Sequence, residues 1–343
     1  MFRLLGVLIT LLYAIGAAVV IWPQFFHLEQ TFPIAQAAAS RGLVILGFLA
    51  LAVVSLLLLT ARPLRGFAAS VLVVSLLGAL VSGGIGIWRG AGPGSLPDKT
   101  DASVRVLTWN TAGEAVSADD IAQAALDQQA DVVTLPETNE EVGERIATLM
   151  GEQDSPMWVH HVNIRPDVPN GPQAWETTIL ISPDLGDYSV IDSSSDGSSN
   201  TGSVPSVVAM PVDGEGPTIV AAHAVAPRAE SMRQWREDLR WIADQCPEGN
   251  FILAGDFNAT LDHMASLGVG GGDMGRCRDA AASTKMGASG TWPSDFPSLL
   301  GAPIDHIMAS QNWKATGTVV LSDSGGSDHR ALVAQLEPAD TEG

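Results

Sequence analysis

Two short segments carry side chains of the kinds that bind divalent metals and phosphates. Gly255-Asp256-Phe257-Asn258 places a carboxylate and a carboxamide two residues apart, and Ser327-Asp328-His329 places a carboxylate beside an imidazole about seventy residues later. Oxygen ligands of this kind are the ones that Mg²⁺ prefers, and an imidazole suits proton transfer near neutral pH. Together these residue types predict hydrolysis of a phosphoester at a metal site.

Further polar side chains lie next to apolar runs that predict β-strands. The pattern predicts helices over 118–129 and 228–245 and strands over 104–109, 131–135, 177–182, 218–223, 251–255, 303–309, 318–321 and 329–336. The polar residues at the strand boundaries are Asn110, Glu137, His223, Asp256, Asn258, Asp305, Asp328 and His329. Turn chemistry explains any one of them alone. As a set they predict a shared site, because loops converge at strand ends in layered α/β folds.

Six motifs along the chain resemble the endonuclease/exonuclease/phosphatase superfamily. They are Thr108-Trp109-Asn110, Leu135-Pro136-Glu137-Thr138, Ala222-His223, Gly255-Asp256-Phe257-Asn258, Ile304-Asp305-His306 and Ser327-Asp328-His329-Arg330. The resemblance covers residues 104–336 and follows the family's order. It implies an α/β fold, a four-layer sandwich with two central mixed β-sheets. The superfamily includes secreted deoxyribonucleases, abasic-site endonucleases, neutral sphingomyelinases and inositol phosphatases.

The resemblance also implies a metal centre and a set of residues around the attacking water. Glu137 is the expected main Mg²⁺ ligand, with Asn110 beside it and Asp328 completing the metal region. Mn²⁺ is the expected substitute metal. Asp256 is expected to align or deprotonate the water, and Asn258 to bind an oxygen of the transferred phosphoryl group.

Histidines are the other expected catalytic groups. By the same resemblance, His329 contacts the phosphate and is oriented by Asp305, while His223 protonates a leaving oxygen. Glu176 is a candidate partner of His223, although a glutamate at a strand edge is also explained by simple solvation. His306 is expected to be a buried core histidine.

The charge of the chain is unevenly distributed. One of the 38 acidic residues and five of the 18 basic residues lie in the first 90 positions, which leaves 37 acids against 13 bases, a net charge of −24, in the remainder. That part lacks the broad basic surface of a dedicated nucleic-acid binder. Arg228, Arg233 and Arg236 follow His223, and a solvated helix face explains them better than a phosphate clamp.

Residues 1–90 predict a membrane anchor. Apolar runs over 4–22, 43–60 and 67–88 contain no charged residue, and each is long enough to cross the hydrocarbon core as a transmembrane helix. A cleaved signal peptide is the alternative for the first run. The arrangement resembles bacterial membrane-anchored members of the superfamily. Residues 91–103 predict a linker, 104–337 the catalytic domain and 338–343 a tail.

The short loops predict the orientation of the anchor. Arg3, Arg62 and Arg65 lie on one side of the three spans, and Arg41 and Arg89 flank the other side. The more basic side is normally cytoplasmic, so the catalytic domain is expected outside the cytoplasm, on the plasma membrane.

The catalytic part contains both cysteines of the chain, Cys246 and Cys277. An oxidising compartment would favour a disulfide between them, which closes a loop of about thirty residues and stabilises the fold by roughly 3 kcal/mol. Two free thiols are the alternative.

The leading hypothesis is a membrane-anchored, extracytoplasmic, Mg²⁺-dependent phosphodiesterase. Its expected partners are the lipid bilayer, through residues 1–90, and a phosphodiester substrate, either nucleic acid or a phospholipid or small phosphoester. A phosphomonoesterase of the same fold is one alternative. A catalytically silent membrane-tethered binding module is another, and the intact set of matched residues argues against it. Loops over 192–206 and 261–275 are expected to carry the specificity.

Overall fold

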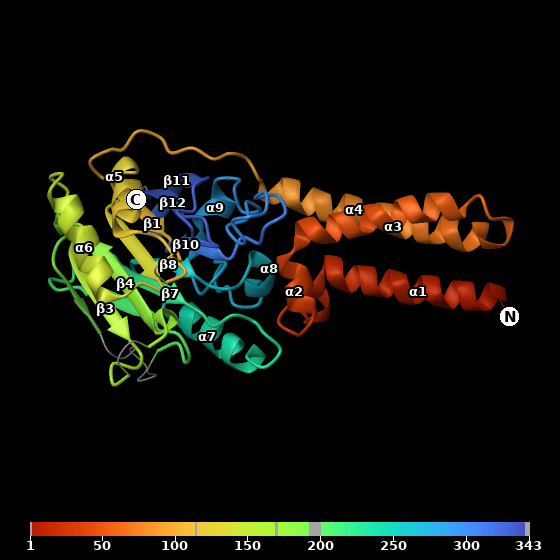
Figure 1. Ribbon diagram of the computed structural model, residues 1–343, viewed down its shortest axis with the longest axis horizontal. Coiled ribbons are helices and arrows are strands. Elements are labelled where there is room, and N and C mark those ends of the chain that lie inside the picture. Colours follow the sequence, from red (N-terminus) through yellow and green to blue (C-terminus); the bar gives the residue numbers. More distant parts are fainter. Residues whose placement is uncertain (1, 114, 169–170, 192–199, 340–343) are drawn as a thin grey trace.

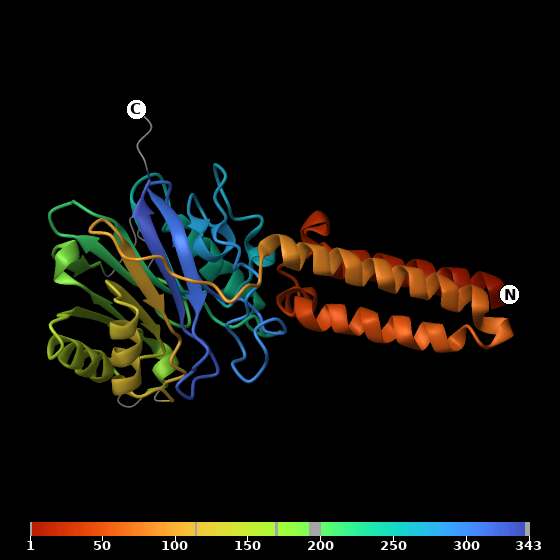
Figure 2. The same ribbon diagram turned by 90° about the horizontal axis from the view of Figure 1, so that it is seen from above.

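A bundle of three long helices projects from one side of a larger α/β domain, and the N-terminus lies at the far end of the bundle (Figures 1 and 2). The computed structural model describes residues 2–113, 115–168, 171–191 and 200–339. The long helices are α1 (Phe2–Ile21), α3 (Arg41–Leu58) and α4 (Arg65–Arg89). Each is long and apolar enough to cross a membrane, as the three apolar runs predicted.

Short helical segments join the three long helices. The turn η2 (Arg62–Leu64) connects α3 to α4 at the far end of the bundle. At the domain end, η1 (Pro23–Phe26) and α2 (Ile34–Ala39) connect α1 to α3. The sequence pattern did not predict η1 or α2, and both contact the α/β domain through α8 (Leu261–Met264).

The α/β domain contains two six-stranded mixed sheets. In order across the first sheet, the strands are β11 (Trp313–Val320), β12 (Leu332–Pro338), β1 (Val104–Thr108), β2 (Val132–Pro136), β4 (Glu176–Ile181) and β3 (Trp158–Asn163). Across the second sheet they are β5 (Tyr188–Val190), β6 (Val207–Pro211), β7 (Thr218–His223), β8 (Phe251–Asp256), β10 (Asp305–Ala309) and β9 (Arg278–Asp279). One parallel pair lies near the middle of each sheet, β1 with β2 and β7 with β8, and the other pairs are antiparallel.

The sheets pack face to face, and helices cover their outer faces. The helices α5 (Ala118–Asp127) and α6 (Glu140–Gly151) pack on the first sheet, and α7 (Met232–Asp244) packs on the second. Three separate apolar cores therefore lie between four layers. This is the four-layer sandwich that the sequence predicted. The smaller elements are α9 (Ala280–Ser283), η3 (Gln173–Trp175) and η4 (Pro183–Leu185).

Most predicted elements are present, and several were missed. The predicted strands and both predicted helices correspond to observed elements, although β11 begins five residues earlier than expected, at Trp313. The missed elements are α6, α8, α9, β3, β5, β6 and β9. Of the predicted loop over 192–206, positions 192–199 lie outside the described residues.

A disulfide joins the end of α7 to the segment before β9. Cys246 and Cys277 are both buried and their Cα atoms are 5.9 Å apart, a normal separation for a disulfide. The bond closes the loop that contains β8 and α8. The pairing that the sequence left open is therefore formed.

The N-terminal helical bundle, residues 2–90, which corresponds to the predicted anchor and is called the anchor below, is docked on the domain through a buried cluster of charges. Arg89 donates two hydrogen bonds of 2.8 Å to the carboxylate of Asp262, and Arg41 donates one of 2.7 Å. The Asp262 side chain is 3% exposed. Burial alone would raise the pKa of Asp262, but the two guanidinium groups hold that pKa well below its usual range.

Two glycines allow the anchor and the domain to approach closely. A Cβ on Gly42 of α3 would lie 2.4 Å from the Leu299 carbonyl oxygen. Gly90, which follows α4, has a φ of 79°, and a Cβ there would lie 1.9 Å from the Lys285 carbonyl oxygen. Its own carbonyl accepts a hydrogen bond from Ala288 N at 2.8 Å. Residues 91–103 continue along the domain, and Ser95 forms a β-bridge with Thr318. The predicted linker is therefore packed against the domain.

The Asp262 cluster leads to a stability prediction. Asp262→Ala leaves two arginines without their buried partner, which costs roughly 3–5 kcal/mol. In detergent, we expect the full-length variant to unfold about 10 °C below wild type, by the usual relation between free energy and midpoint. Asp244→Ala is the control, because Asp244 is an exposed aspartate at the end of α7. Equal midpoints for the two variants would show that the cluster does not stabilise the protein.

Candidate active site

Every second side chain of a central strand points into the space between the two sheets. The polar residues at the strand ends occupy the next position of that same inward-facing series. In β8, Ile252 and Ala254 point into the core between the sheets, and Asp256 is the next residue of the same face. Ile219 and Ala221 of β7 lead in the same way to His223. The sequence alternation thus delivers charged and polar groups to one end of the apolar core.

The same rule places residues from two further strands. Val104 and Val106 of β1 face the core, and Asn110 follows at the same parity beyond the end of the strand. Asp305 begins β10 and pairs in register with Asp256 of β8. Groups from both sheets therefore meet at one end of the sandwich, as their positions in the sequence predicted.

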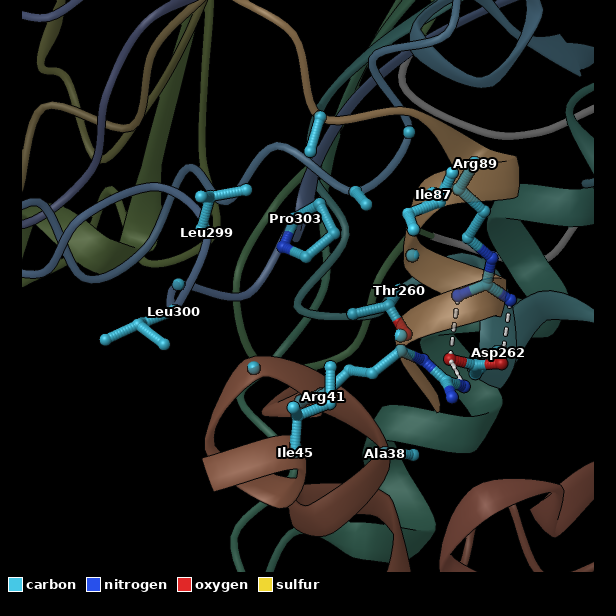
Figure 3. Close-up of a pocket in the computed structure, with 18 of the residues that line it drawn as sticks. Ala38, Arg41, Ile45, Ile87, Arg89, Thr260, Asp262, Leu299, Leu300 and Pro303 are labelled. Atoms are coloured by element: carbon cyan, nitrogen blue, oxygen red, sulfur yellow. Dashed lines mark hydrogen bonds and ion pairs between the residues drawn. The ribbon is translucent and has the colours of Figure 1, made fainter. Parts of the chain in front are cut away.

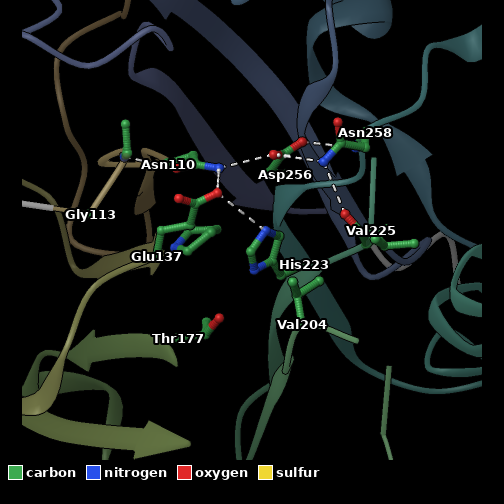
Figure 4. Close-up of polar contacts among 12 residues, drawn as sticks. Asn110, Gly113, Glu137, Thr177, Val204, His223, Val225, Asp256 and Asn258 are labelled. Carbon is green, nitrogen blue, oxygen red and sulfur yellow. Dashed lines mark hydrogen bonds and ion pairs between the residues drawn. The ribbon is translucent and has the colours of Figure 1, made fainter. Parts of the chain in front are cut away.

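Asn110 links the carboxylates of the two sheets (Figure 4). Its Nδ2 donates to Glu137 Oε1 at 3.1 Å and to Asp256 Oδ2 at 3.0 Å. Its Oδ1 accepts from the backbone N–H of Ala112 at 3.0 Å. The Asn110 amide thus presents its nitrogen to the carboxylates, and its oxygen does not face them as the predicted metal ligand would.

Local backbone geometry aims Glu137 and Asp256. Glu137 has a φ of 61° and Asn258 a φ of 46°, a left-handed conformation that non-glycine residues seldom adopt. Gly255 has a φ of 156°, and a Cβ there would lie 1.8 Å from the Ala222 carbonyl oxygen. This position in the Gly255 motif therefore requires glycine, because β7 and β8 approach closely there.

Asn258 holds Asp256 in place. Its backbone N–H donates to Asp256 Oδ1 at 2.8 Å, and its Nδ2 donates to Asp256 Oδ2 at 3.0 Å and to the Ala224 carbonyl at 2.9 Å (Figure 4). Both side-chain hydrogens of Asn258 are used in these contacts. Binding of a phosphoryl oxygen by Asn258 stays a prediction. In the structure, Asn258 fixes the position of the Asp256 carboxylate.

His329 lies between two buried carboxylates. Its Nδ1 lies 2.8 Å from Asp305 Oδ2, and its Nε2 lies 3.8 Å from Asp256 Oδ2. Burial lowers the pKa of His329, but the charges of Asp305 and then Asp256 overcome that effect and raise the pKa to about 10. The predicted orientation of His329 by Asp305 is therefore formed, and the ring is an imidazolium at neutral pH.

The pKa values of Asp256 and His223 are shifted in the directions expected for buried groups, upward for the carboxyl and downward for the imidazole. Burial, followed by the charge of Asp305, raises the pKa of Asp256 to about 7, against the opposing effect of His329. Burial, followed by the charge of His329, lowers the pKa of His223 to about 3. His223 is thus a neutral imidazole, with its Nε2 3.9 Å from Glu137 Oε1.

The residues present suit a divalent cation. The group contains three carboxylates, those of Glu137, Asp256 and Asp305, and one imidazolium, so the site carries surplus negative charge that would repel a phosphate. Glu137 is a partly exposed carboxylate at the edge of the group, and no lysine or arginine pairs with it among the described residues. An oxygen-rich set of this kind fits Mg²⁺.

A second grouping offers a nitrogen ligand. Ligand atoms of Asp256, Asp305 and His329 lie within 4.8 Å of one another. His329 would have to lose its proton to bind a metal, and its two carboxylate neighbours oppose that loss. We therefore favour Glu137, assisted by Asp256, as the oxygen donor for a metal.

Asp328 is exposed and hydrogen-bonded to a different loop. Its Oδ2 accepts from Trp292 Nε1 at 2.9 Å, and its backbone carbonyl accepts from Ser294 N at 2.7 Å. No interaction joins it to Glu137 among the described residues. Its place as a metal ligand stays a prediction, and the hydrogen bond shows only that Trp292 lies beside Asp328.

The side chains of two other predicted residues do not join this group. Glu176 was expected to pair with His223, and this pairing is not formed: its Oε2 lies 3.3 Å from His161 Nε2. The reason is the register of β3 with β4, which places His161 beside the start of β4. His306 is the buried core histidine that was expected, with Asp279 2.6 Å from Nδ1 and the Ala259 carbonyl 2.8 Å from Nε2.

Ser327 is a site residue that was not singled out. Its Oγ donates to the Asn110 carbonyl at 2.7 Å and accepts from the His329 N–H at 3.0 Å. It therefore ties the loop of His329 to the end of β1. Its position at the start of the Ser327-Asp328-His329 motif was the available signal.

The sequence matches a model of the Endonuclease/Exonuclease/phosphatase family over residues 107–329. The chain belongs to this family. The matched segment contains all eight residues predicted at strand boundaries, so the resemblance found in the six motifs is confirmed. A search of curated proteins found none that matches.

Solved structures share the fold of this family member at low sequence identity. The endonuclease/exonuclease/phosphatase from Beutenbergia cavernae DSM 12333 has a TM-score of 0.52 and 17% identity over 69% of this chain and 72% of its own. A family protein from Leptotrichia buccalis C-1013-b has a TM-score of 0.52 and 15% identity over 68% and 99%. A humanized D. rerio TDP2 has a TM-score of 0.50 and 15% identity over 69% and 99%. These likenesses concern the fold alone.

The charge of Asp305 raises the pKa of both Asp256 and His329, which leads to a pH prediction. If hydrolysis needs Asp256 ionised and His329 protonated, wild-type activity rises through a pH of about 7 and falls through about 10. Asp305→Asn removes the charge, so both the rise and the fall of activity should move to lower pH. The fall in activity should move by about one pH unit or more. A pH–rate profile measures the rise and the fall. An NMR titration of the ring, assigned with His329→Gln, checks the second pKa. An unchanged titration of His329 would contradict the role of Asp305.

Proposed function

We propose that the protein is a membrane-anchored phosphodiesterase that uses Mg²⁺ and acts outside the cytoplasm. The observation that carries the proposal is the group at the end of the sandwich, in which Asp256 and Asp305 flank the His329 imidazolium and Asn110 links Asp256 to Glu137, in a chain of the endonuclease/exonuclease/phosphatase family. Such a group can hold a metal, orient a water molecule and stabilise charge on a phosphate. Mn²⁺ is a plausible replacement because it prefers similar ligands.

Each residue has a role that its surroundings support. Glu137 would hold the metal, which when bound would neutralise charge on the phosphate oxygens. Asp256, fixed by Asn110 and Asn258, accepts a proton from the attacking water. His329 remains protonated beside Asp305 and offers its Nε2 hydrogen to the phosphate.

The neutral ring of His223 carries one proton. Its Nε2 lies 3.9 Å from Glu137 Oε1, so that side of the ring faces the proposed metal ligand. A neutral imidazole beside the metal ligand can donate a hydrogen bond to the leaving oxygen without adding a second positive charge. This role differs from the protonation that the family resemblance implies, because a neutral ring that gave up its one N–H proton would become an imidazolate.

The substrate is proposed at the level of a phosphodiester. The part of the chain after residue 90 has a net charge of −24, which disfavours a long polyanion and is compatible with a lipid or small phosphodiester. Nucleic acid stays a second candidate. A phosphomonoesterase and a catalytically silent binding module are the alternatives, and the intact group of Glu137, Asp256, Asp305 and His329 disfavours the silent module.

Hydrolysis by the full-length protein in detergent tests the proposal. Plasmid DNA, RNA, a phospholipid, a chromogenic phosphodiester and the matching phosphomonoester are each incubated with Mg²⁺, Mn²⁺ or chelator. We expect chelator-sensitive turnover of at least one diester. Asp256→Asn and His329→Gln should lower it about a hundredfold or more, as expected for loss of a proton-transfer group. Glu137→Gln should raise the metal concentration needed for half-maximal activity.

Glu176→Gln is the matched control. It makes the same chemical change as Glu137→Gln, but the Glu176 side chain contacts His161. The backbone carbonyl of Glu176, which accepts a hydrogen bond from the Glu137 N–H at 3.0 Å, is unchanged by the substitution. We expect wild-type activity from it. If folded wild-type protein binds no divalent metal and hydrolyses none of the substrates, the proposal is wrong. Faster turnover of the monoester than of any diester would favour the phosphatase alternative.

The disulfide and the arginines of the short loops support an extracytoplasmic domain. Disulfides persist in oxidising compartments, and Arg62 and Arg65 lie in the turn opposite the domain, where basic residues favour the cytoplasm. We expect a reporter enzyme that works only outside the cytoplasm to be active when fused after Gly343. The same reporter fused after Ala61, between α3 and α4, should be silent. The reverse result would invert the orientation.

A further inference from the structure

A cavity of about 500 Å³ lies where the anchor meets the α/β domain (Figure 3). Its walls come from the domain ends of α3 and α4 and from the loop after residue 298. The side chains and glycines that matter for its shape are Ile45, Leu46, Gly86, Ile87, Leu299 and Leu300. The residues of the candidate active site do not line it, so it is a separate site.

The polarity of the cavity changes along the bundle. Gly83 and Arg89 both line it and are six positions apart in α4, a distance of about 9 Å along the helix axis. The end near Gly83 and Leu46 is apolar and lies on the side of the spans. The end near Arg89, Arg41 and Asp262 is charged and lies on the side of the domain. The apolar end suits the tail of an amphiphilic molecule, and the charged end suits its polar head group.

The charged end carries a surplus positive charge. Arg41 and Arg89 share the single carboxylate of Asp262, so two cations face one anion (Figure 3). Their side chains keep 13% and 14% of their surface exposed, and both line the cavity. The excess charge is complementary to an anionic head group and not to a neutral one.

The wall of the cavity is open toward the surroundings of the spans. A Cβ added at Gly83 or Gly86 would meet no atom within 4 Å. Ile87 is 83% exposed, and Leu299, on the opposite rim, is 63% exposed. Exposed apolar side chains on both rims suit contact with hydrocarbon. The cavity is therefore continuous with the apolar surface of helices that are long enough to cross a bilayer.

We propose that this cavity binds one anionic phospholipid of the surrounding bilayer. An acyl chain lies between α3 and α4 against Ile45 and Ile87, and the phosphate of the head group lies near Arg41 and Arg89. The lipid then fills the junction between the anchor and the domain. Three features of the cavity carry the proposal: its gradient of polarity, its excess of one positive charge and its continuity with the spans. None of them depends on catalytic activity, so the proposal stands apart from the proposed function.

Native mass spectrometry of the full-length protein tests lipid binding. Protein taken from nanodiscs that contain equal amounts of phosphatidylglycerol and phosphatidylcholine is washed with detergent and then weighed. We expect one retained phosphatidylglycerol per chain. Failure to retain any lipid would overturn the proposal, and so would equal retention of the two lipids. Addition of inorganic phosphate alone should not displace the lipid, because the acyl chain contributes to binding; displacement would point to a simple anion site.

A pair of phenylalanine variants tests the place of binding. Gly86→Phe puts a large side chain into the open cavity, whereas Gly84→Phe makes the same change two residues earlier, at an exposed position of α4 that does not line the cavity. We expect Gly86→Phe to retain about tenfold less phosphatidylglycerol, a change of roughly 1.4 kcal/mol, and Gly84→Phe to match wild type. Equal retention by the two variants would overturn the assignment to this cavity.

Arg41→Gln tests the selection of charge. It leaves Arg89 paired with Asp262, so the surplus charge disappears while the apolar walls remain. We expect the preference for phosphatidylglycerol over phosphatidylcholine to vanish. A preference that persists in a variant with an unchanged unfolding midpoint would refute the role of the arginines.

Discussion

Three ionisable side chains are buried together at the end of the sandwich, and they are stable there only because they interact. An isolated charge of this kind would cost several kilocalories per mole to remove from water. His329 lies between Asp305 and Asp256 and offsets part of their charge, while Asn110 and Asn258 donate to Asp256. These contacts come from both sheets, so they exist only when the sheets close on each other. The packing of the apolar core and the formation of the site are therefore one event.

The sequence predicted those features that depend on the residue pattern of one strand alone, such as the direction in which a side chain points. Alternation along β8 identifies Asp256 as an inward-facing residue before any neighbour is known, and the same holds for His223 in β7. The edge strand β3 was missed because its side chains are only partly buried and Trp158, at its start, is 52% exposed. The helix α6 had a usable signal in Asn139, which caps it, and in the two glutamates of its first turn.

Partners across long sequence distances could not be predicted in this way. Asp262 follows the Gly255 motif in the first turn of α8, yet its partners, Arg41 and Arg89, lie more than 170 positions earlier in the chain. Those arginines carried information about orientation in the membrane and none about this contact. The predicted pairing of Glu176 with His223 was wrong for the same reason, because the pairing register of β3 with β4 brings His161 to Glu176. Local pattern determines which face a side chain occupies, and only the assembled layers determine what it meets there.

The docked helical bundle fixes the candidate site relative to the three long helices. Asp256 and Asp262 are only six positions apart, so their Cα atoms cannot be more than about 22 Å apart. The intervening loop is held from both sides: Trp235 Nε1 donates to the Asn258 carbonyl at 3.1 Å, and Trp235 packs edge-on against His263. His263 in turn lies 2.9 Å from the Ala35 carbonyl of the anchor through its Nε2. A flexible tether would let the domain sample many heights and tilts above a membrane. Here the same short loop carries the candidate catalytic residue Asp256 and binds the helical bundle, so the orientation of the candidate site relative to the long helices is a property of the fold.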